Sequence, residues 1–136
     1  MKLSVVTPEK ALWLNTVVTD LIVPGYLGEL NILDGHAPLM TVLSTGVLRF
    51  KVENSDKETS IAISWGYLEV YPGGVNVLAE TAEMAQDIDI ERAKNALKKA
   101  ELHLLSDKLT EEEIEKCNRK IERSLVRQSV YGSNKS

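Results

Sequence analysis

The sequence predicts an α+β chain, with an antiparallel β-sandwich or flattened barrel over residues 1–84 and an antiparallel two-helix hairpin over residues 85–136. Two observations carry this prediction. Up to residue 84, short segments rich in Val, Ile, Leu, Thr and Tyr are interrupted every several residues by Pro, Gly, Asn or Asp. This is typical of strands joined by tight turns. Beyond residue 85, apolar residues recur every three or four positions, which is the period of an α-helix.

Roughly eight to ten strand-like segments precede the helices, and two of them show the pattern clearly. In GVLRFKV (residues 46–52), Leu48, Phe50 and Val52 fall on one face of an extended chain, as a half-buried antiparallel strand requires. Further on, the Pro-Gly-Gly sequence of residues 72–74 separates two apolar runs. It predicts the turn of a hairpin.

Each predicted helix has one apolar stripe, and turn signals separate the two helices. In the segment SDKLTEEE (residues 106–113), Thr110 and Glu113 fit a capping box at the start of the second helix. The final segment SVYGSNKS (residues 129–136) predicts a frayed tail. The predicted stripes consist of Ala93, Leu97, Ala100 and Leu104 in the first helix, and Ile114, Cys117, Ile121 and Leu125 in the second.

Composition narrows the choice of partners. The chain has 136 residues, a net charge of -4, 43% hydrophobic residues and 26% charged residues, which is typical of a soluble globular protein without a bias toward nucleic acid. A single cysteine, Cys117, rules out an intramolecular disulfide. Because no segment resembles a membrane span or a signal peptide, we expect no direct membrane insertion and any membrane link to run through a partner.

The loop around His36 invites a catalytic interpretation. However, the only other histidine is His103, and no convergent nucleophile, base or metal-ligand set is apparent. The alternative takes Asp34 and Gly35 as turn formers, His36 as a side chain that bridges loop backbone, and Pro38 as an edge terminator. We favour this structural interpretation, and we expect neither a catalytic residue nor a metal site.

The segment DIDIERA (residues 87–93) has two interpretations. Asp87 or Asp89 can cap the first helix, while Ala93 begins its apolar stripe. Alternatively, Asp89 accepts hydrogen bonds from an adenine amino group or a ribose hydroxyl, and Arg92 meets phosphate. The spacing alone favours capping.

The second helix carries a row of basic residues with few acidic neighbours in its later part. Such a row is either a solvated face or a docking surface for acidic protein groups or phosphates, and the charge pattern favours neither. We call it the basic row; it consists of Lys116, Arg119, Lys120, Arg123 and Arg127.

Four segments together resemble the epsilon subunit family of F-type ATP synthases. They are VVTPEKALW (residues 5–13), GELNILDGHAPLMTVLSTGVLR (28–49), GYLEV (66–70) and AEMAQDIDIERAKNALKKAE (82–101). The resemblance implies a ten-stranded sandwich followed by a helical hairpin, with the histidine loop in a structural role. It also implies a non-catalytic rotor subunit on the cytoplasmic face of the bacterial plasma membrane.

The resemblance implies partners as well. In the family, the sandwich binds the gamma subunit and rests on the ring of c subunits. The hairpin either folds beside the sandwich or extends along gamma toward the alpha and beta subunits, where it blocks rotation in the direction of hydrolysis. The basic row would then meet acidic residues of a beta subunit.

No cofactor is implied as a requirement, but some bacterial members bind regulatory ATP on the folded hairpin through the motif [IL]-D-x-x-R-A. Lys99 stands where a third arginine is expected, which keeps the charge but loses a bidentate fork. Capping of the first helix remains an open explanation of Asp89. The ATP-site residues implied by the resemblance are Glu83, Ile88, Asp89, Arg92, Ala93, Lys99, Arg123 and Arg127.

An alternative from another functional class is a free-standing ligand-binding sandwich whose helices form a dimerisation arm. It predicts a sheet face lined with aromatic side chains. Trp13, Trp65, Phe50 and four tyrosines are the only aromatic residues that could supply one.

Overall fold

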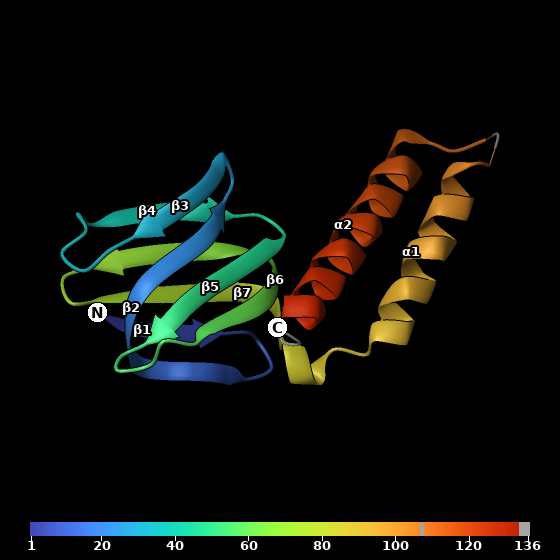
Figure 1. Cartoon of the computed structure of the whole chain (residues 1–136). Helices are drawn as coiled ribbons and strands as arrows, with labels where there is room; N and C mark the ends of the chain where they lie inside the picture. Colours follow the sequence, from blue (N-terminus) through green and yellow to red (C-terminus); the bar gives the residue numbers. More distant parts are fainter. Residues whose placement is uncertain (107, 134–136) are drawn as a thin grey trace.

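The computed structural model describes residues 1–106 and 108–133, and it shows a β-sandwich with a helical hairpin attached at one end (Figure 1). The strands are β1 (Lys2–Val6), β2 (Ala11–Gly25), β3 (Gly28–Ile32), β4 (Leu39–Leu43), β5 (Gly46–Val52), β6 (Glu58–Tyr71) and β7 (Gly74–Met84). A short 3-10 helix η1 (Ala85–Asp87) leads into α1 (Ile90–Leu104) and α2 (Glu111–Ser133). The predicted fold class is confirmed.

The sandwich has two layers because three long strands each serve in both. One layer has the order β3, β2, β5, β6, β7, and the other has the order β4, β6, β7, β1, β2. We call them the first and second layers. Each layer has five strand positions, so seven continuous strands occupy the ten positions of the expected sandwich.

Strand β6 changes layer at its middle. Residues 58–63 pair with β5 in the first layer, and residues 66–70 pair with β4 in the second. Between them, Trp65 has φ 47°, in the left-handed region that strands normally avoid. A Cβ at the next residue, Gly66, would collide with the backbone carbonyl of Leu78 on β7. Glycine therefore permits the close approach of two bent strands.

One strand pairing departs from the antiparallel pattern that the sequence predicts. Strands β1 and β7 run parallel, with Lys2 opposite Gly74 and Val6 opposite Leu78. On its other side, β1 is antiparallel to β2. Strand β1 therefore lies between β7 and β2 and joins them in the second layer.

The core lies between the two layers and is built by alternation along the strands. Leu48 and Phe50 are buried, as the pattern of residues 46–52 predicts. The Trp13 ring meets Phe50 edge-on, with 5.4 Å between ring centroids. We call this set the sandwich core; its buried members are Leu3, Val5, Val18, Leu21, Val23, Ile32, Leu43, Leu48, Phe50, Ile61, Ile63, Leu68, Val70, Val75, Val77, Ala79 and Ala82.

The two helices pack side by side in antiparallel directions (Figure 1). Their buried contact residues are small: Ala93 and Ala100 on α1, with Cys117 and Ser124 on α2. Leu125 was expected in the second stripe, but this prediction is wrong, because Leu125 is 52% exposed. The seam instead runs from Cys117 through Ile121 to Ser124, steps of four and three that keep to one helix face.

The frayed tail expected from residue 129 onward is also incorrect for the part that the structure describes. Helix α2 continues to Ser133, and Val130 is 1% exposed. Residues 134–136 of that segment lie outside the described residues. Within the described ranges, neither α1 nor α2 is long and apolar enough to cross a bilayer.

Candidate functional site

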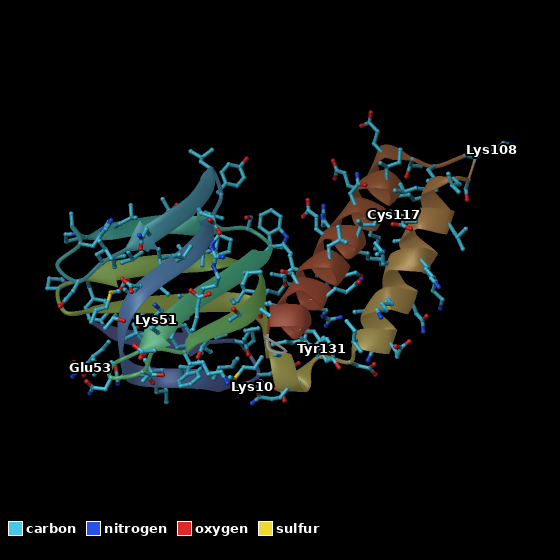
Figure 2. All side chains as sticks on the ribbon, in the orientation of Figure 1. Lys10, Lys51, Glu53, Lys108, Cys117 and Tyr131 are labelled. Carbon is cyan, nitrogen blue, oxygen red and sulfur yellow. The ribbon has the colours of Figure 1, made fainter. Side chains whose placement is uncertain are left out.

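The hairpin meets the sandwich at one end, which we call the joint. Figure 2 shows Tyr131 at this end, whereas Cys117 lies farther along, between the helices. At the joint, Ile88 and Val130 pack against Ala62 on the outer face of β6. Val47, Ala85, Val126 and Tyr131 pack around them and are half-buried. Burying a Val or Ile side chain contributes about 1.5–3 kcal/mol, so this contact is small beside the sandwich core.

An ion pair lies next to this apolar contact. The Arg127 Nε of α2 donates to Oε1 of Glu83, near the end of β7, at 2.6 Å. A terminal nitrogen of the same guanidinium lies 2.5 Å from that oxygen and completes the ion pair. The Arg127 side chain is 37% exposed and that of Glu83 is 26% exposed. Partial burial keeps such a pair from being fully screened by solvent, while enough water remains to limit the desolvation cost.

The eight residues implied for ATP do not share one pocket. Glu83, Arg123 and Arg127 converge on a cavity of about 40 Å³ at the joint, whereas small-molecule sites usually measure about 300–1,000 Å³. A nucleotide at these residues would therefore require the joint to open.

The other members of that set lie around the start and middle of α1. The Asp89 carboxylate accepts from the backbone N–H of Arg92 at 3.1 Å and caps the helix. Ile88 is buried in the joint and Ala93 in the seam between the helices, while the Arg92 and Lys99 side chains are exposed.

The basic row is divided by its contacts. Lys116, Lys120 and Arg123 are exposed on α2, and no ion pair holds them within the described residues. Arg119 lies 3.5 Å from Glu115 of the same helix. Arg127 is held by Glu83, so the row offers fewer unpaired cations than its sequence pattern indicates.

The histidine loop joins β3 to β4 at the end of the sandwich away from the hairpin (Figure 1). The His36 N–H donates to the Leu33 carbonyl at 3.0 Å, and its Nδ1 lies 2.7 Å from the Ala37 carbonyl oxygen. Gly35 has φ +82°, which suits a turn. His36 therefore contacts loop backbone, and the described residues contain no group of three His, Cys, Asp or Glu side chains placed to hold a metal.

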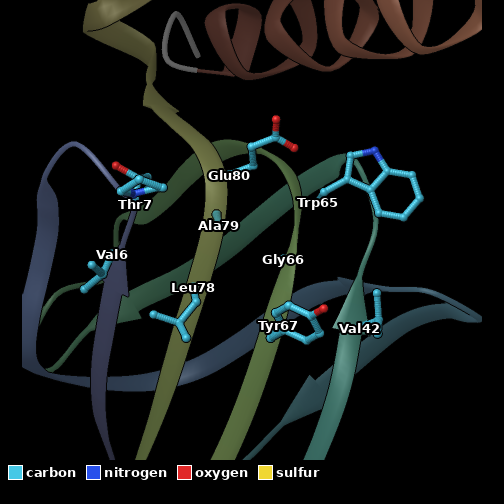
Figure 3. Close-up of a pocket in the computed structure, with 10 residues that line it drawn as sticks. Val6, Thr7, Val42, Trp65, Gly66, Tyr67, Leu78, Ala79 and Glu80 are labelled. Carbon is cyan, nitrogen blue, oxygen red and sulfur yellow. The ribbon is translucent and has the colours of Figure 1, made fainter. Parts of the chain in front are cut away.

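The outer face of the second layer carries an uncovered apolar band. Register places Val42 opposite Tyr67, Tyr67 opposite Leu78, and Leu78 opposite Val6, so one side chain from each of four strands forms a continuous row. Tyr67 is 61% exposed and Leu78 is 55% exposed. Figure 3 shows this row and, at its rim, Trp65 and Glu80.

This band lines a shallow groove of about 540 Å³, and sequence reasoning missed it. The sequence does place an apolar residue at an outward position in several strands. Only the pairing register of the strands shows that these residues lie side by side. Aliphatic residues flank the aromatic Tyr67 and Trp65. Such mixed aromatic and aliphatic patches are typical of protein–protein interfaces.

Comparison with known proteins gives concordant results. Residues 1–85 match the family model described as ATP synthase, Delta/Epsilon chain, beta-sandwich domain. The ATP synthase epsilon chain of Geobacter sulfurreducens is 40% identical over 132 residues, covering 97% of this chain and 94% of the relative. The epsilon chain of Bdellovibrio bacteriovorus is 43% identical over 113 residues, covering 83% and 81%.

Solved structures show the same fold. A chain in the cryo-EM structure of Euglena gracilis mitochondrial ATP synthase, comprising OSCP, F1 and c-ring, superposes with a TM-score of 0.83 at 22% identity, covering 95% of this chain and 79% of that chain. A chain of the Tetrahymena thermophila mitochondrial ATP synthase central stalk and c-ring gives a TM-score of 0.68 at 11% identity, with 96% of each chain covered.

Proposed function

Because this chain belongs to the ATP synthase delta/epsilon family, as an epsilon chain, we propose that it couples rotation in the central stalk to ATP synthesis and restrains ATP hydrolysis through its hairpin. The observation that carries the proposal is likeness at 40% identity across sandwich and hairpin together. In this role the chain is a non-catalytic subunit, peripheral to the membrane on the cytoplasmic side.

We place the gamma subunit on the apolar band of the second layer. Val42, Tyr67 and Leu78 lie in one row on this face without any covering element, and a stalk subunit needs a lasting contact that survives torque. The opposite end of the sandwich, with the His36 loop and the β6–β7 turn, would then rest on the c-ring. This end lies away from the hairpin (Figure 1). The c-ring contact at this end and the gamma contact on the sheet face can therefore form together.

The gamma contact is tested by titrating the gamma subunit of the same organism with the full chain and with Leu78→Asp. Leu78 is 55% exposed, so the substitution spares the core. We expect at least about 30-fold weaker binding, because truncating an interface anchor typically costs 2 kcal/mol or more. The control is Leu102→Asp on α1, at 68% exposure. Equal binding by the two variants would exclude this face.

The inhibitory role rests on the exposed cations of α2. If the hairpin extends toward the alpha and beta subunits, Lys116 and Lys120 can meet acidic groups there, because neither forms an ion pair with any residue that the structure describes. In the reconstituted complex, we expect Lys116→Gln with Lys120→Gln to raise ATP hydrolysis severalfold. Lys94→Gln with Lys98→Gln, an exposed pair on α1, is the matched control. Unchanged hydrolysis in the first variant would contradict the proposed contact.

We also propose that ATP regulates the hairpin, with Arg123 contacting phosphate. The support for this proposal is that the exposed guanidinium of Arg123 lines the same cavity as Glu83 and Arg127. In calorimetric titration of ATP into the full chain, we expect saturable binding that Arg123→Gln weakens about 10-fold or more, since a charged hydrogen bond contributes about 1.5–3 kcal/mol. Arg119→Gln should bind as the unmodified chain does. Absence of heat at millimolar ATP would overturn this part.

A further inference from the structure

The docked hairpin is held through a narrow attachment. Helix α1 packs along α2, and the contacts with the sandwich come chiefly from the last turns of α2 and from η1. The sandwich core lies within the strands and contains no residue of either helix. The hairpin can therefore leave the sandwich as a unit without exposing that core, provided that the contacts at the joint break.

Those contacts are of two kinds. The apolar contact of Ala62, Ile88 and Val130 is non-directional and tolerates sliding. The Glu83–Arg127 pair joins β7 to α2: the Arg127 Nε donates to Oε1 of Glu83, and a terminal nitrogen of the guanidinium lies 2.5 Å from the same oxygen. Such charged hydrogen bonds depend on geometry, so this pair fixes the angle at which the hairpin leaves the sandwich.

We propose that the Glu83–Arg127 ion pair is a latch that keeps the hairpin docked in the absence of any ligand. Both partners line the small cavity at the joint, and Arg123 lines it beside them. Arg127 cannot serve the latch and an acidic partner surface at once, so engagement of Arg127 elsewhere and docking of the hairpin exclude each other. The inference deepens the proposed regulation and rests on the mobile hairpin of that function.

The chain between the two bodies provides the pivot. Strand β7 ends at Met84, one residue after the latch carboxylate, and α1 begins at Ile90. Only η1 and two extended residues, Ile88 and Asp89, lie between them. A change of backbone angles in this short link would swing both helices together, while the Asp89 cap keeps α1 intact.

The test measures hairpin position in the full chain without nucleotide. Spin labels are placed at Glu53→Cys on the sandwich and Glu101→Cys on α1, both exposed positions, in a Cys117→Ala background. We expect one narrow distance distribution. Glu83→Gln or Arg127→Gln should each add a broad population, and the exchanged pair Glu83→Arg with Arg127→Glu should restore the narrow one. Arg123 lines the same cavity but forms no ion pair among the described residues, so Arg123→Gln should leave the distribution unchanged.

Several outcomes would overturn the latch. A narrow distribution in both single variants would mean that the apolar contact suffices, and a released hairpin in the exchanged pair would mean that shape rather than charge was lost. Salt gives a test without substitution: at 1 M NaCl the Debye length falls to about 3 Å, so the released population should grow. If it does not grow, apolar burial dominates. Failure of the latch would leave the gamma-binding and hydrolysis results untouched, because those do not depend on Glu83.

Discussion

Asp89 is the residue at which two interpretations of the sequence meet. Its carboxylate accepts from the Arg92 N–H at 3.1 Å, so capping accounts for its position without a ligand. We predict that Asp89→Ala lowers the stability of the helical hairpin by about 1 kcal/mol, because the first turn of α1 loses its cap. Asp89→Asn should lose much less, since asparagine caps equally well.

Chemical unfolding followed by circular dichroism at 222 nm would measure both variants. Equal losses in the two variants would show that the charge of Asp89, and not its capping oxygen, stabilises the hairpin. With Asn in place, ATP titration separates the two roles, because the cap is retained while the carboxylate is removed.

At the level of side chains, short-range features were predictable and long-range ones were not. The Thr110 hydroxyl accepts from the Glu113 N–H at 3.2 Å, as the capping-box spacing predicts. The Glu83–Arg127 pair joins residues 44 positions apart, and no local pattern marks it. Both residues were singled out through family resemblance, but their direct contact emerges only from the docking of α2 on the sandwich.

Among the elements, the end of α2 contradicts its local sequence most clearly. Ser, Gly and Asn near the C-terminus predicted fraying, yet Val130 is 1% exposed and packs against the sandwich. Tertiary contact outweighs weak helix propensity here.

We predict that ending the chain at Gln128 releases the hairpin, because the cut removes both Val130 and Tyr131 from the joint. Small-angle X-ray scattering should show a larger radius of gyration, while most of the helix signal persists. If the shorter chain kept the radius of gyration of the full chain, the contact of Val130 at the joint would not be what holds the hairpin on the sandwich.

Elements with a strong period were predictable, whereas their connections in space were not. Alternation located the strand of residues 46–52, and the helical period located α1 and α2. The change of layer in β6 depends on Trp65 in a left-handed conformation and on the close approach of Gly66 to β7. Both conditions involve residues distant in sequence, which local pattern cannot supply. The apolar band depends on the pairing register of β4, β6, β7 and β1, so it could not be predicted from the sequence either.

At the scale of the whole molecule, the chain consists of two bodies with unequal interiors. The sandwich core contains large buried side chains such as Leu21, Phe50 and Leu68. The helices meet over Ala93, Ala100, Cys117 and Ser124, which bury little apolar area. Because burial of apolar area dominates stability, the hairpin should be the weaker body. The proposed movement of the hairpin on an intact sandwich requires this difference in stability.

This inequality predicts that thermal unfolding is not two-state. Both tryptophans, Trp13 and Trp65, lie in the sandwich, so their fluorescence reports that body alone, while ellipticity at 222 nm reports mainly the helices. We expect the helical signal to fall at a lower temperature than the fluorescence changes. A chain ending at Asp87 should keep the fluorescence transition of the full chain within a few degrees, because the hairpin adds no residue to the sandwich core. Coincident transitions in the full chain, with a lower one in the shortened chain, would instead show that hairpin and sandwich unfold as one cooperative unit. In that case the hairpin could not move without loosening the sandwich, to which we propose that the gamma subunit binds.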